Sequence, residues 1–136
     1  MATRGIRNNN PLNIRRGSKW IGMTAAQTDT EFCQFQSMTF GVRAAVKLIT
    51  SYISGANAQH KAFNTVQAII SRWAPDKENN TESYVNFVSN RSGLNRFYRI
   101  GRYDKDAIFH LVAAMAKYES GFILNRPLFD SAWAML

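Results

Sequence analysis

The sequence predicts a mainly α-helical domain that carries at most a small β or irregular element. Its 136 residues are 46% hydrophobic and include 9 Phe, 5 Tyr and 3 Trp, enough apolar material for one packed core without a stabilising disulfide or metal. Apolar residues recur at helical spacing in several segments. Strand-like alternation is limited to a stretch around 32–35. We therefore expect one compact domain spanning 1–136.

The first third of the chain is predicted to be largely irregular. Residues 4–37 contain the run NNNP at 8–11, which is a turn signal, and the stretch at 32–35 predicts either a short strand or an extended segment. The first long helix is predicted over 39–54 and ends at Gly55. Its apolar stripe consists of Val42, Ala45, Val46, Ile49 and Ile53.

Two helices follow, each bounded by residues that start or stop a helix. The first begins after a cap at Asn64 or Thr65 and stops at Pro75, because proline cannot continue a helix. The second begins at a Thr81 cap and closes at Gly93.

A basic aromatic loop at 94–102 separates these helices from two more. One is capped by Asp104 and ends at Glu119, before Gly121. The last is short and begins at Pro127, since proline favours the first position of a helix.

Glu119 has an unusual position for a carboxylate. It follows an apolar stripe by four residues, which predicts that it continues the core-facing side of its helix. Burial of a carboxyl group raises its pKa and can keep it protonated near neutral pH, the state that a general acid needs. The alternative is that the last turn frays and Glu119 turns into solvent. The stripe consists of Ile108, Leu111, Val112 and Met115.

The other carboxylates are weaker candidates for chemistry. Glu78 and Glu82 are interpreted as solvated or capping residues, since Glu82 opens a helix where its charge suits the dipole. Asp29 and Glu31 lie in a polar loop. Asp29 remains a possible second carboxylate.

Charge and composition limit the classes of partner. The net charge of +8 and the pI near 10.1 indicate an anionic partner, which could be nucleic acid or the bacterial cell wall. A single cysteine, Cys33, and two histidines argue against a disulfide or a zinc site, so no metal or cofactor is expected. The chain has no apolar run long enough for a membrane span and no secretory signal, so we expect synthesis in the cytoplasm.

Three segments resemble the lysozyme-like lytic transglycosylases, the family typified by soluble lytic transglycosylase domains and goose-type lysozyme. The segment AKYESGF at 116–122 is similar to the catalytic segment of that family. The resemblance implies Glu119 as general acid and base, and Ser120 as the residue that orients it.

The other two segments resemble parts of the substrate cleft of that family. Gln34 and Phe35 match the end of a Gly-Leu-Met-Gln-Phe strip. Thr81 and Tyr84 match a Thr-x-x-Tyr-Val helix, and Trp73 stands near the position of a substrate-contacting tyrosine. In the family the glutamate segment comes first, whereas here it comes last. The chain therefore resembles a circularly permuted lysozyme-like domain of α+β class.

A second resemblance is to small phage-borne proteins that carry an Asn-Asn-Pro-Gly-Asn-Ile-Arg signature and are described as virion structural or lysozyme-like proteins. GIRNNNPLNIR at 5–15 carries this resemblance, with FGVRA at 40–44 and RWAPDKENNT at 72–81. Leu12 replaces the glycine of the signature, so the backbone there does not need a positive φ.

These observations favour a peptidoglycan-cleaving muramidase or lytic transglycosylase that acts on the MurNAc–GlcNAc β-1,4 bond at the bacterial cell wall. The amides of Asn10, Asn13 and Gln34 are expected to bind acetamido groups, and the rings of Trp73 and Tyr84 to stack on sugars. One alternative is a non-catalytic virion protein that binds glycan or other virion proteins. A nucleic-acid-binding module ranks third, and no sequence-specific nucleic acid is expected, because no groove-reading element is recognisable.

Overall fold

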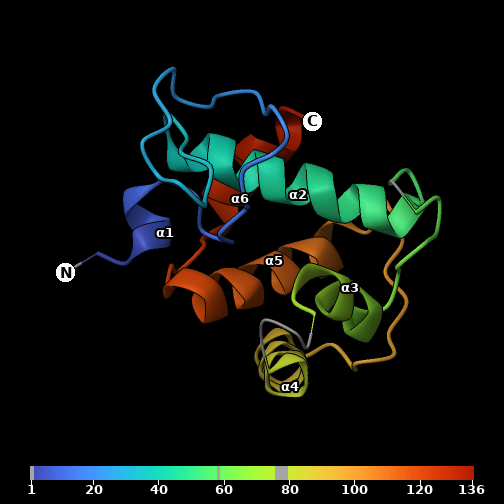
Figure 1. The fold of residues 1–136 in the computed structure, drawn as a ribbon. Helices are drawn as coiled ribbons and strands as arrows, with labels where there is room; N and C mark the ends of the chain where they lie inside the picture. Colours follow the sequence, from blue (N-terminus) through green and yellow to red (C-terminus); the bar gives the residue numbers. More distant parts are fainter. Residues whose placement is uncertain (1, 58, 76–79) are drawn as a thin grey trace. The chain divides into compact units, whose positions relative to one another are not determined.

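The computed structural model describes residues 2–57, 59–75 and 80–136. Within these residues the chain forms six helices and no strand beyond isolated β-bridges, so the mainly α prediction is confirmed (Figure 1). The helices are α1 (Arg4–Arg7), α2 (Met38–Ser54), α3 (Val66–Trp73), α4 (Thr81–Ser92), α5 (Lys105–Ser120) and α6 (Arg126–Ala134).

The chain divides into two compact units. Unit 1 comprises Met1–Lys47 and Met115–Leu136, and unit 2 comprises Leu48–Ala114. The divisions fall inside α2 and α5, so each of these helices contributes one part to each unit. The single lysozyme-like domain stays a prediction.

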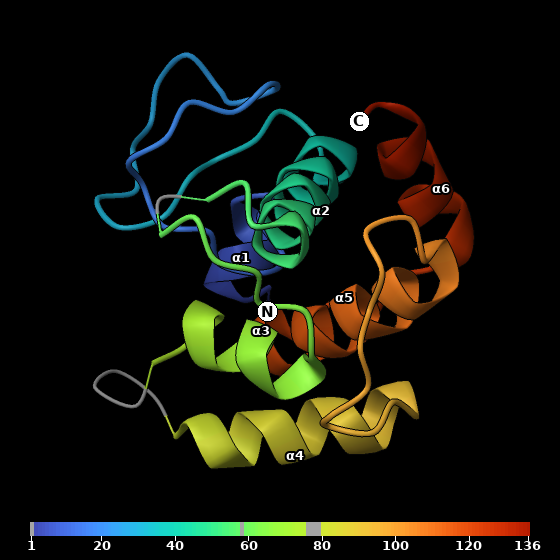
Figure 2. The same ribbon diagram turned by 90° about the vertical axis from the view of Figure 1, so that its right-hand side faces the viewer.

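Unit 1 contains a long segment, residues 8–37, between α1 and α2 (Figure 2). Two antiparallel bridges, Arg15 with Phe32 and Met23 with Phe35, fold this segment back on itself. The extended stretch predicted at 32–35 is therefore present as isolated pairings instead of a regular strand. The buried apolar side chains of unit 1 include Leu12, Ile14, Phe35, Val42, Val46, Met115 and Phe129.

Three consecutive asparagines hold the long segment in place. The Asn8 amide donates to Asp29 Oδ2 (2.9 Å) and the Asn9 amide to the Phe35 carbonyl (3.0 Å). Asn10 is fully buried, and its amide donates to the Ile14 and Cys33 carbonyls at 3.0 and 2.9 Å. These bonds replace the regular backbone pairing that the segment lacks, because buried polar groups need partners.

Unit 2 is built around α3 and α4, which contact each other and lie side by side in Figures 1 and 2. Thr65 caps α3 by accepting from the Ala68 amide, as predicted. Asn80, not Thr81, caps α4. Thr81 is the first helical residue, and its hydroxyl instead donates to the Ala74 carbonyl at 2.5 Å.

The glycines predicted to close three of the helices do so, although α5 runs one residue past Glu119 and α6 begins one residue before Pro127. Gly55, Gly93 and Gly121 follow α2, α4 and α5, and each has a left-handed φ between 74° and 82°. Asp104 Oδ1 accepts from the Ala107 amide at the start of α5. Leu12 has no positive φ, whereas its neighbour Asn13 does (53°).

Candidate functional site

Glu119 lies in the last turn of α5, where it meets the N-terminal segment of unit 1. Its side chain is half-buried, neither sealed in the core nor turned fully into solvent. The Asn13 amide nitrogen lies 3.3 Å from Glu119 Oε1 and 3.2 Å from the Glu119 carbonyl oxygen. The Asn13 amide therefore hydrogen-bonds both the carboxyl group and the backbone carbonyl of Glu119, a residue 106 positions away in the sequence.

The Asn13 side chain has a defined orientation. A carbonyl oxygen can only accept, so the Asn13 atom that faces the Glu119 carbonyl must be the amide nitrogen. This orientation places Asn13 Oδ1 on the other side, where it is buried and has no hydrogen-bond donor among the described residues. The φ of 53° at Asn13 is tolerated because asparagine enters the left-handed region more readily than most residues.

Gly5 makes this close packing possible. A Cβ atom at Gly5 would lie 2.7 Å from Ser120 Cβ and 2.8 Å from Asn13 Oδ1, closer than atoms can pack. Any larger residue at position 5 would push Asn13 and Ser120 apart. The glycine in α1 thus sets the distance between the N-terminal segment and the end of α5.

Ser120 ties the end of α5 to the N-terminal segment. Its buried hydroxyl donates to the Pro11 carbonyl (2.8 Å) and is also 3.1 Å from the Ala116 carbonyl. The Thr3 hydroxyl donates to the Ser120 carbonyl at 2.7 Å. The Asn13 side chain contacts the Glu119 carboxyl group, and the role of Ser120 as its orienting residue stays a prediction.

Other predicted binding residues of unit 1 have structural partners. The Asn10 amide and carbonyl oxygen are both occupied by backbone groups, and the residue is 0% exposed, so it is not accessible to a substrate. Phe35 is also buried. Gln34 donates to Asn8 Oδ1 and accepts from the Thr28 amide at 2.6 Å. Of the four residues predicted here, Asn13 contacts Glu119 through the two hydrogen bonds described above.

The predicted binding residues of unit 2 differ in their exposure. Tyr84 is 1% exposed and Thr81 8%, so in this structure neither presents a surface on which a sugar ring could stack. Trp73 is half-buried and packs edge-on against Tyr52, with ring centroids 6.2 Å apart. The burial of Tyr84 follows from its place on the inner face of α4, beside Val85 and Val88.

Asp29 belongs to a cluster of ionic and hydrogen-bonding groups in unit 1. Arg4 pairs with both carboxylate oxygens, at 2.6 and 2.7 Å, and the amides of Asn8, Glu31 and Phe32 donate to the same carboxylate. These donors, Arg4 foremost, hold the pKa of Asp29 well below its usual range. Asp29 is thus a structural anion that stays charged at neutral pH.

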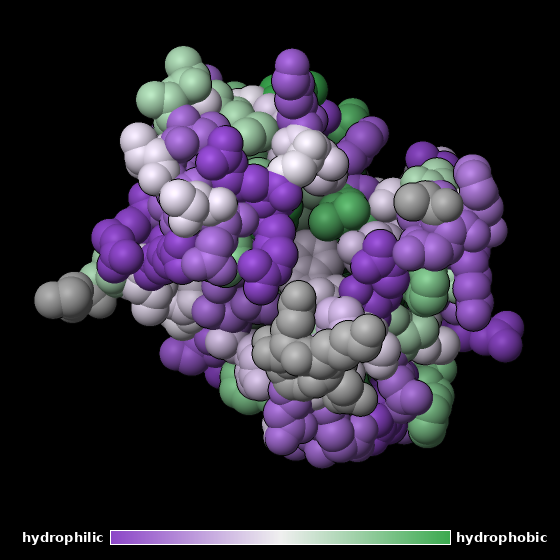
Figure 3. Space-filling view, viewed as in Figure 1, coloured by the Kyte–Doolittle hydropathy of each residue, from purple (hydrophilic) through white to green (hydrophobic). Residues whose placement is uncertain are grey.

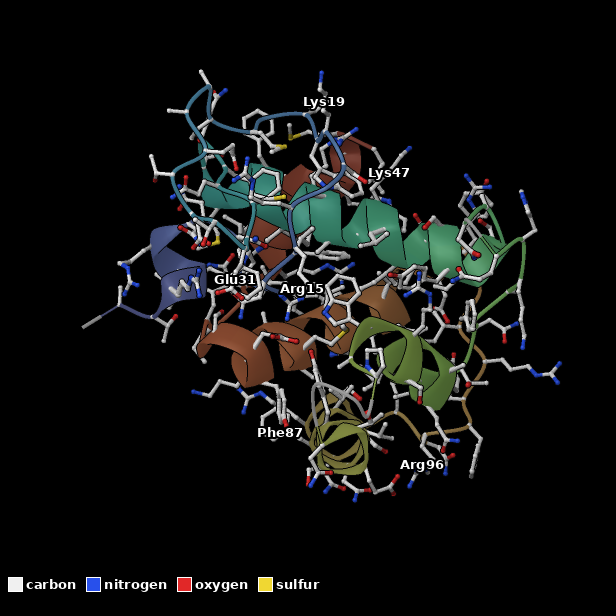
Figure 4. The ribbon with its side chains drawn as sticks, in the orientation of Figure 1. Arg15, Lys19, Glu31, Lys47, Phe87 and Arg96 are labelled. Atoms are coloured by element: carbon white, nitrogen blue, oxygen red, sulfur yellow. The ribbon has the colours of Figure 1, made fainter. Side chains whose placement is uncertain are left out.

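The Arg4–Asp29 pair extends into a small charged network. Glu31 lies 3.3 Å from Arg4 and 3.6 Å from Arg15, and the Arg15 and Glu31 side chains point toward one another in Figure 4. Both arginines also stack over the Phe32 ring, with Cζ at 4.7 and 5.3 Å from its centroid. The sequence offered no signal for this network, because its members are not neighbours in the chain: Arg4 and Asp29 are 25 positions apart.

Hydrophilic side chains dominate the visible surface. In Figure 3, hydrophilic residues cover most of the coloured surface and hydrophobic patches are small. Lys19 extends away from the ribbon in Figure 4. Among the described residues, no helix is long and apolar enough to cross a membrane, and no group of three potential metal ligands comes together.

Comparison with known proteins gives one informative relationship. A scan against models of known protein families finds no match. Protein P5 of Pseudoalteromonas phage PM2 is 36% identical over 124 residues, which cover 88% of this chain and 72% of that protein. The expected relationship to a phage protein is thereby confirmed, whereas neither the group with the Asn-Asn-Pro-Gly-Asn-Ile-Arg signature nor a lysozyme-like family is shown by it. The chain belongs to the family of Protein P5 of Pseudoalteromonas phage PM2.

Proposed function

We propose that this protein cleaves the glycan strands of peptidoglycan at the MurNAc–GlcNAc β-1,4 bond, with Glu119 as general acid and base. The contact between Asn13 and Glu119 carries the proposal. A carboxyl group at a helix end can adopt several rotamers, and the Asn13 donor on Glu119 Oε1 favours some of them. The bond also joins the C-terminal glutamate segment to the N-terminal Asn-rich segment, the two segments that the proposed permutation makes neighbours.

The chemistry needs one proton to move twice. Glu119 donates its proton to the glycosidic oxygen, the bond from that oxygen to C1 of MurNAc breaks, and positive charge develops on C1 and the ring oxygen. The nucleophile, either the 6-hydroxyl of the same sugar or water, then bonds to C1 and returns its proton to Glu119. Proton transfer by a positioned carboxyl group contributes typically about 10²–10⁴-fold in rate.

A one-carboxylate mechanism suits the described residues of unit 1. Asp29, the second carboxylate considered from the sequence, is fully engaged by Arg4, Asn8 and two backbone amides. An anion held by so many donors is a poor nucleophile and a poor base. The attacking oxygen therefore comes from the substrate or from water, and not from a second carboxylate of the enzyme.

The proposed acid is tested by removing one carboxyl group at a time. We expect the purified protein to clear a peptidoglycan zymogram and Glu119→Gln to clear at least 100-fold less, in line with the general-acid contribution of about 10²–10⁴-fold. Glu31→Gln is the matched control, because Glu31 is a half-exposed carboxylate of the same unit. Equal clearing by wild type and Glu119→Gln would reject the assignment.

A second candidate is a non-catalytic virion protein that binds glycan. It is favoured by the relationship to a phage protein and by the burial of Asn10, Thr81 and Tyr84, which removes several predicted cleft contacts. This candidate predicts co-sedimentation with purified sacculi without release of soluble muropeptides. Mass spectrometry of the supernatant distinguishes the two, since released muropeptides would exclude a purely structural role.

A further inference from the structure

The loop between α4 and α5, in unit 2, presents aromatic rings to solvent. Phe97, Tyr98 and Tyr103 are 65%, 41% and 79% exposed. Arg96, Arg99 and Arg102 alternate with them along the chain. The loop follows α4 and runs back past α3 to α5 in Figure 1. Exposed aromatic side chains interspersed with arginines are typical of a surface that binds a ligand or a partner molecule.

The backbone of this loop is well anchored. Ile100 is 2% exposed, and its amide donates to the Asn64 carbonyl at 2.7 Å. The Gln67 amide donates to the Arg96 carbonyl at 2.9 Å, and Arg99 forms an antiparallel bridge with Thr65. The loop is therefore fixed against the start of α3. Rings on a fixed backbone lose less conformational entropy when a ligand binds them.

Two of the exposed rings carry a guanidinium group on one face. Arg96 Cζ lies 5.8 Å from the Phe97 centroid, and Arg102 Cζ lies 5.4 Å from the Tyr103 centroid. Glu82 pairs with Arg96 through both carboxylate oxygens, at 2.6 and 2.8 Å, which holds that guanidinium in place. At Phe97 the charge of Arg96 is balanced by Glu82, whereas at Tyr103 the aromatic ring lies beside the positive charge of Arg102.

Apart from Arg96, which pairs with Glu82, the charged residues of the loop are the arginines Arg99 and Arg102. Arg99 and Arg102 are exposed. Asp104, the nearest carboxylate in sequence, accepts a hydrogen bond from the Tyr98 hydroxyl at 2.9 Å. The loop thus combines a net positive charge with rings that a planar ligand can stack on.

We propose that the loop Asn95–Tyr103 binds single-stranded nucleic acid without sequence preference. Aromatic rings accept any base because every base has a π-face, and arginines neutralise the phosphates. An anionic membrane would also attract the arginines, but hydrocarbon insertion needs apolar side chains. Ile100 is buried, Leu94 is half-buried, and two of the three exposed rings bear a hydroxyl group. Stacking on bases therefore fits the loop better than insertion into lipid.

The test is fluorescence anisotropy of the full chain with a labelled oligothymidylate and a mixed-sequence single strand. We expect both to bind with similar affinity, and to bind more weakly as salt is raised, because counterions are released on binding. Tyr103→Ala and Phe97→Ala should each weaken binding about 5- to 150-fold, the range for loss of one stacked base. Tyr103→Phe should retain binding, because it keeps the ring.

Control variants outside the loop test whether binding depends on this loop or on any exposed aromatic ring or positive charge. Tyr118→Ala removes another exposed tyrosine, and Lys19→Gln removes an exposed cation of unit 1. Both should bind the single strand nearly as wild type does, whereas Arg99→Gln and Arg102→Gln should weaken binding and lower its salt dependence. Equal binding by Tyr103→Ala and wild type would overturn the proposal. Binding to vesicles of anionic lipid, or to sacculi, without binding to either oligonucleotide would also overturn it.

Discussion

Substitution of Gly41 by alanine should destabilise the protein, although alanine is the better helix former. Gly41 lies in α2, where the backbone of Asn9 rests directly against it. A Cβ atom at this position would lie 1.8 Å from the Asn9 carbonyl oxygen and 2.9 Å from its carbon. To reach an ordinary contact of 3.4 Å, the Asn9 carbonyl would have to retreat by about 1.6 Å.

The expected loss of stability follows from the contacts that a shift of the Asn9 carbonyl would disturb. Overpacking costs about 1–3 kcal/mol. Two hydrogen bonds of the same stretch would be strained, from the Asn9 amide group to the Phe35 carbonyl and from the Phe35 amide to the Asn8 carbonyl, at about 0.5–1.5 kcal/mol each. The helix preference of alanine over glycine offsets about 1 kcal/mol. We expect a net loss of about 1–5 kcal/mol in the free energy of unfolding.

Urea unfolding followed by far-UV circular dichroism measures this loss. Gly101→Ala is the control, because no atom lies within 4 Å of its added Cβ and its φ is not positive. The control should change the free energy of unfolding by less than about 0.5 kcal/mol. If Gly41→Ala were as stable as Gly101→Ala, the close approach of Asn9 to α2 would be refuted, and with it the packing that positions the Asn-rich segment.

Two further predictions concern the polar groups of unit 1. Asn13→Ala removes both hydrogen bonds to Glu119 and should cost about 1–2 kcal/mol in stability; if Asn13 positions the acid, kcat for muropeptide release should fall while KM changes little, and an unchanged kcat would remove Asn13 from the mechanism. Asp29 has a depressed pKa in the folded state, chiefly through Arg4, so its contribution is present above the ordinary carboxyl pKa of about 4 and is lost as the pH falls below it. Thermal unfolding across pH should therefore show a steeper acid loss of Tm in wild type than in Asp29→Asn, and parallel curves would contradict this reasoning.

Helices and their ends were largely predictable from the sequence, because the interactions that set them are local. Thr65 accepts from an amide three residues later, and Gly121 follows its helix in the left-handed conformation. The cap of α4 was assigned to Thr81 instead of Asn80, since both residues are good caps and adjacent in sequence. The choice depends on the Ala74 carbonyl, which takes the Thr81 hydroxyl.

The candidate site was predictable only in part. The sequence pointed to Glu119 and to the asparagines, but not to which asparagine contacts it. The Asn10 side chain is hydrogen-bonded to the Ile14 and Cys33 backbone, whereas the Asn13 side chain is hydrogen-bonded to Glu119. Side-chain amides of the same type in one short run cannot be distinguished without knowing what packs around them.

The sequence by itself determined the helices, the positive charge and the phage relationship, since periodicity, caps, composition and identity are all properties of residues in order. Tertiary structure decided which polar groups are used and which stay available. It joined Asn13 to Glu119, occupied Asp29 with Arg4, buried Tyr84 and exposed Tyr103. The physical reason is that a buried donor or acceptor takes its partner from whatever the fold brings near, and here those partners come from distant parts of the chain.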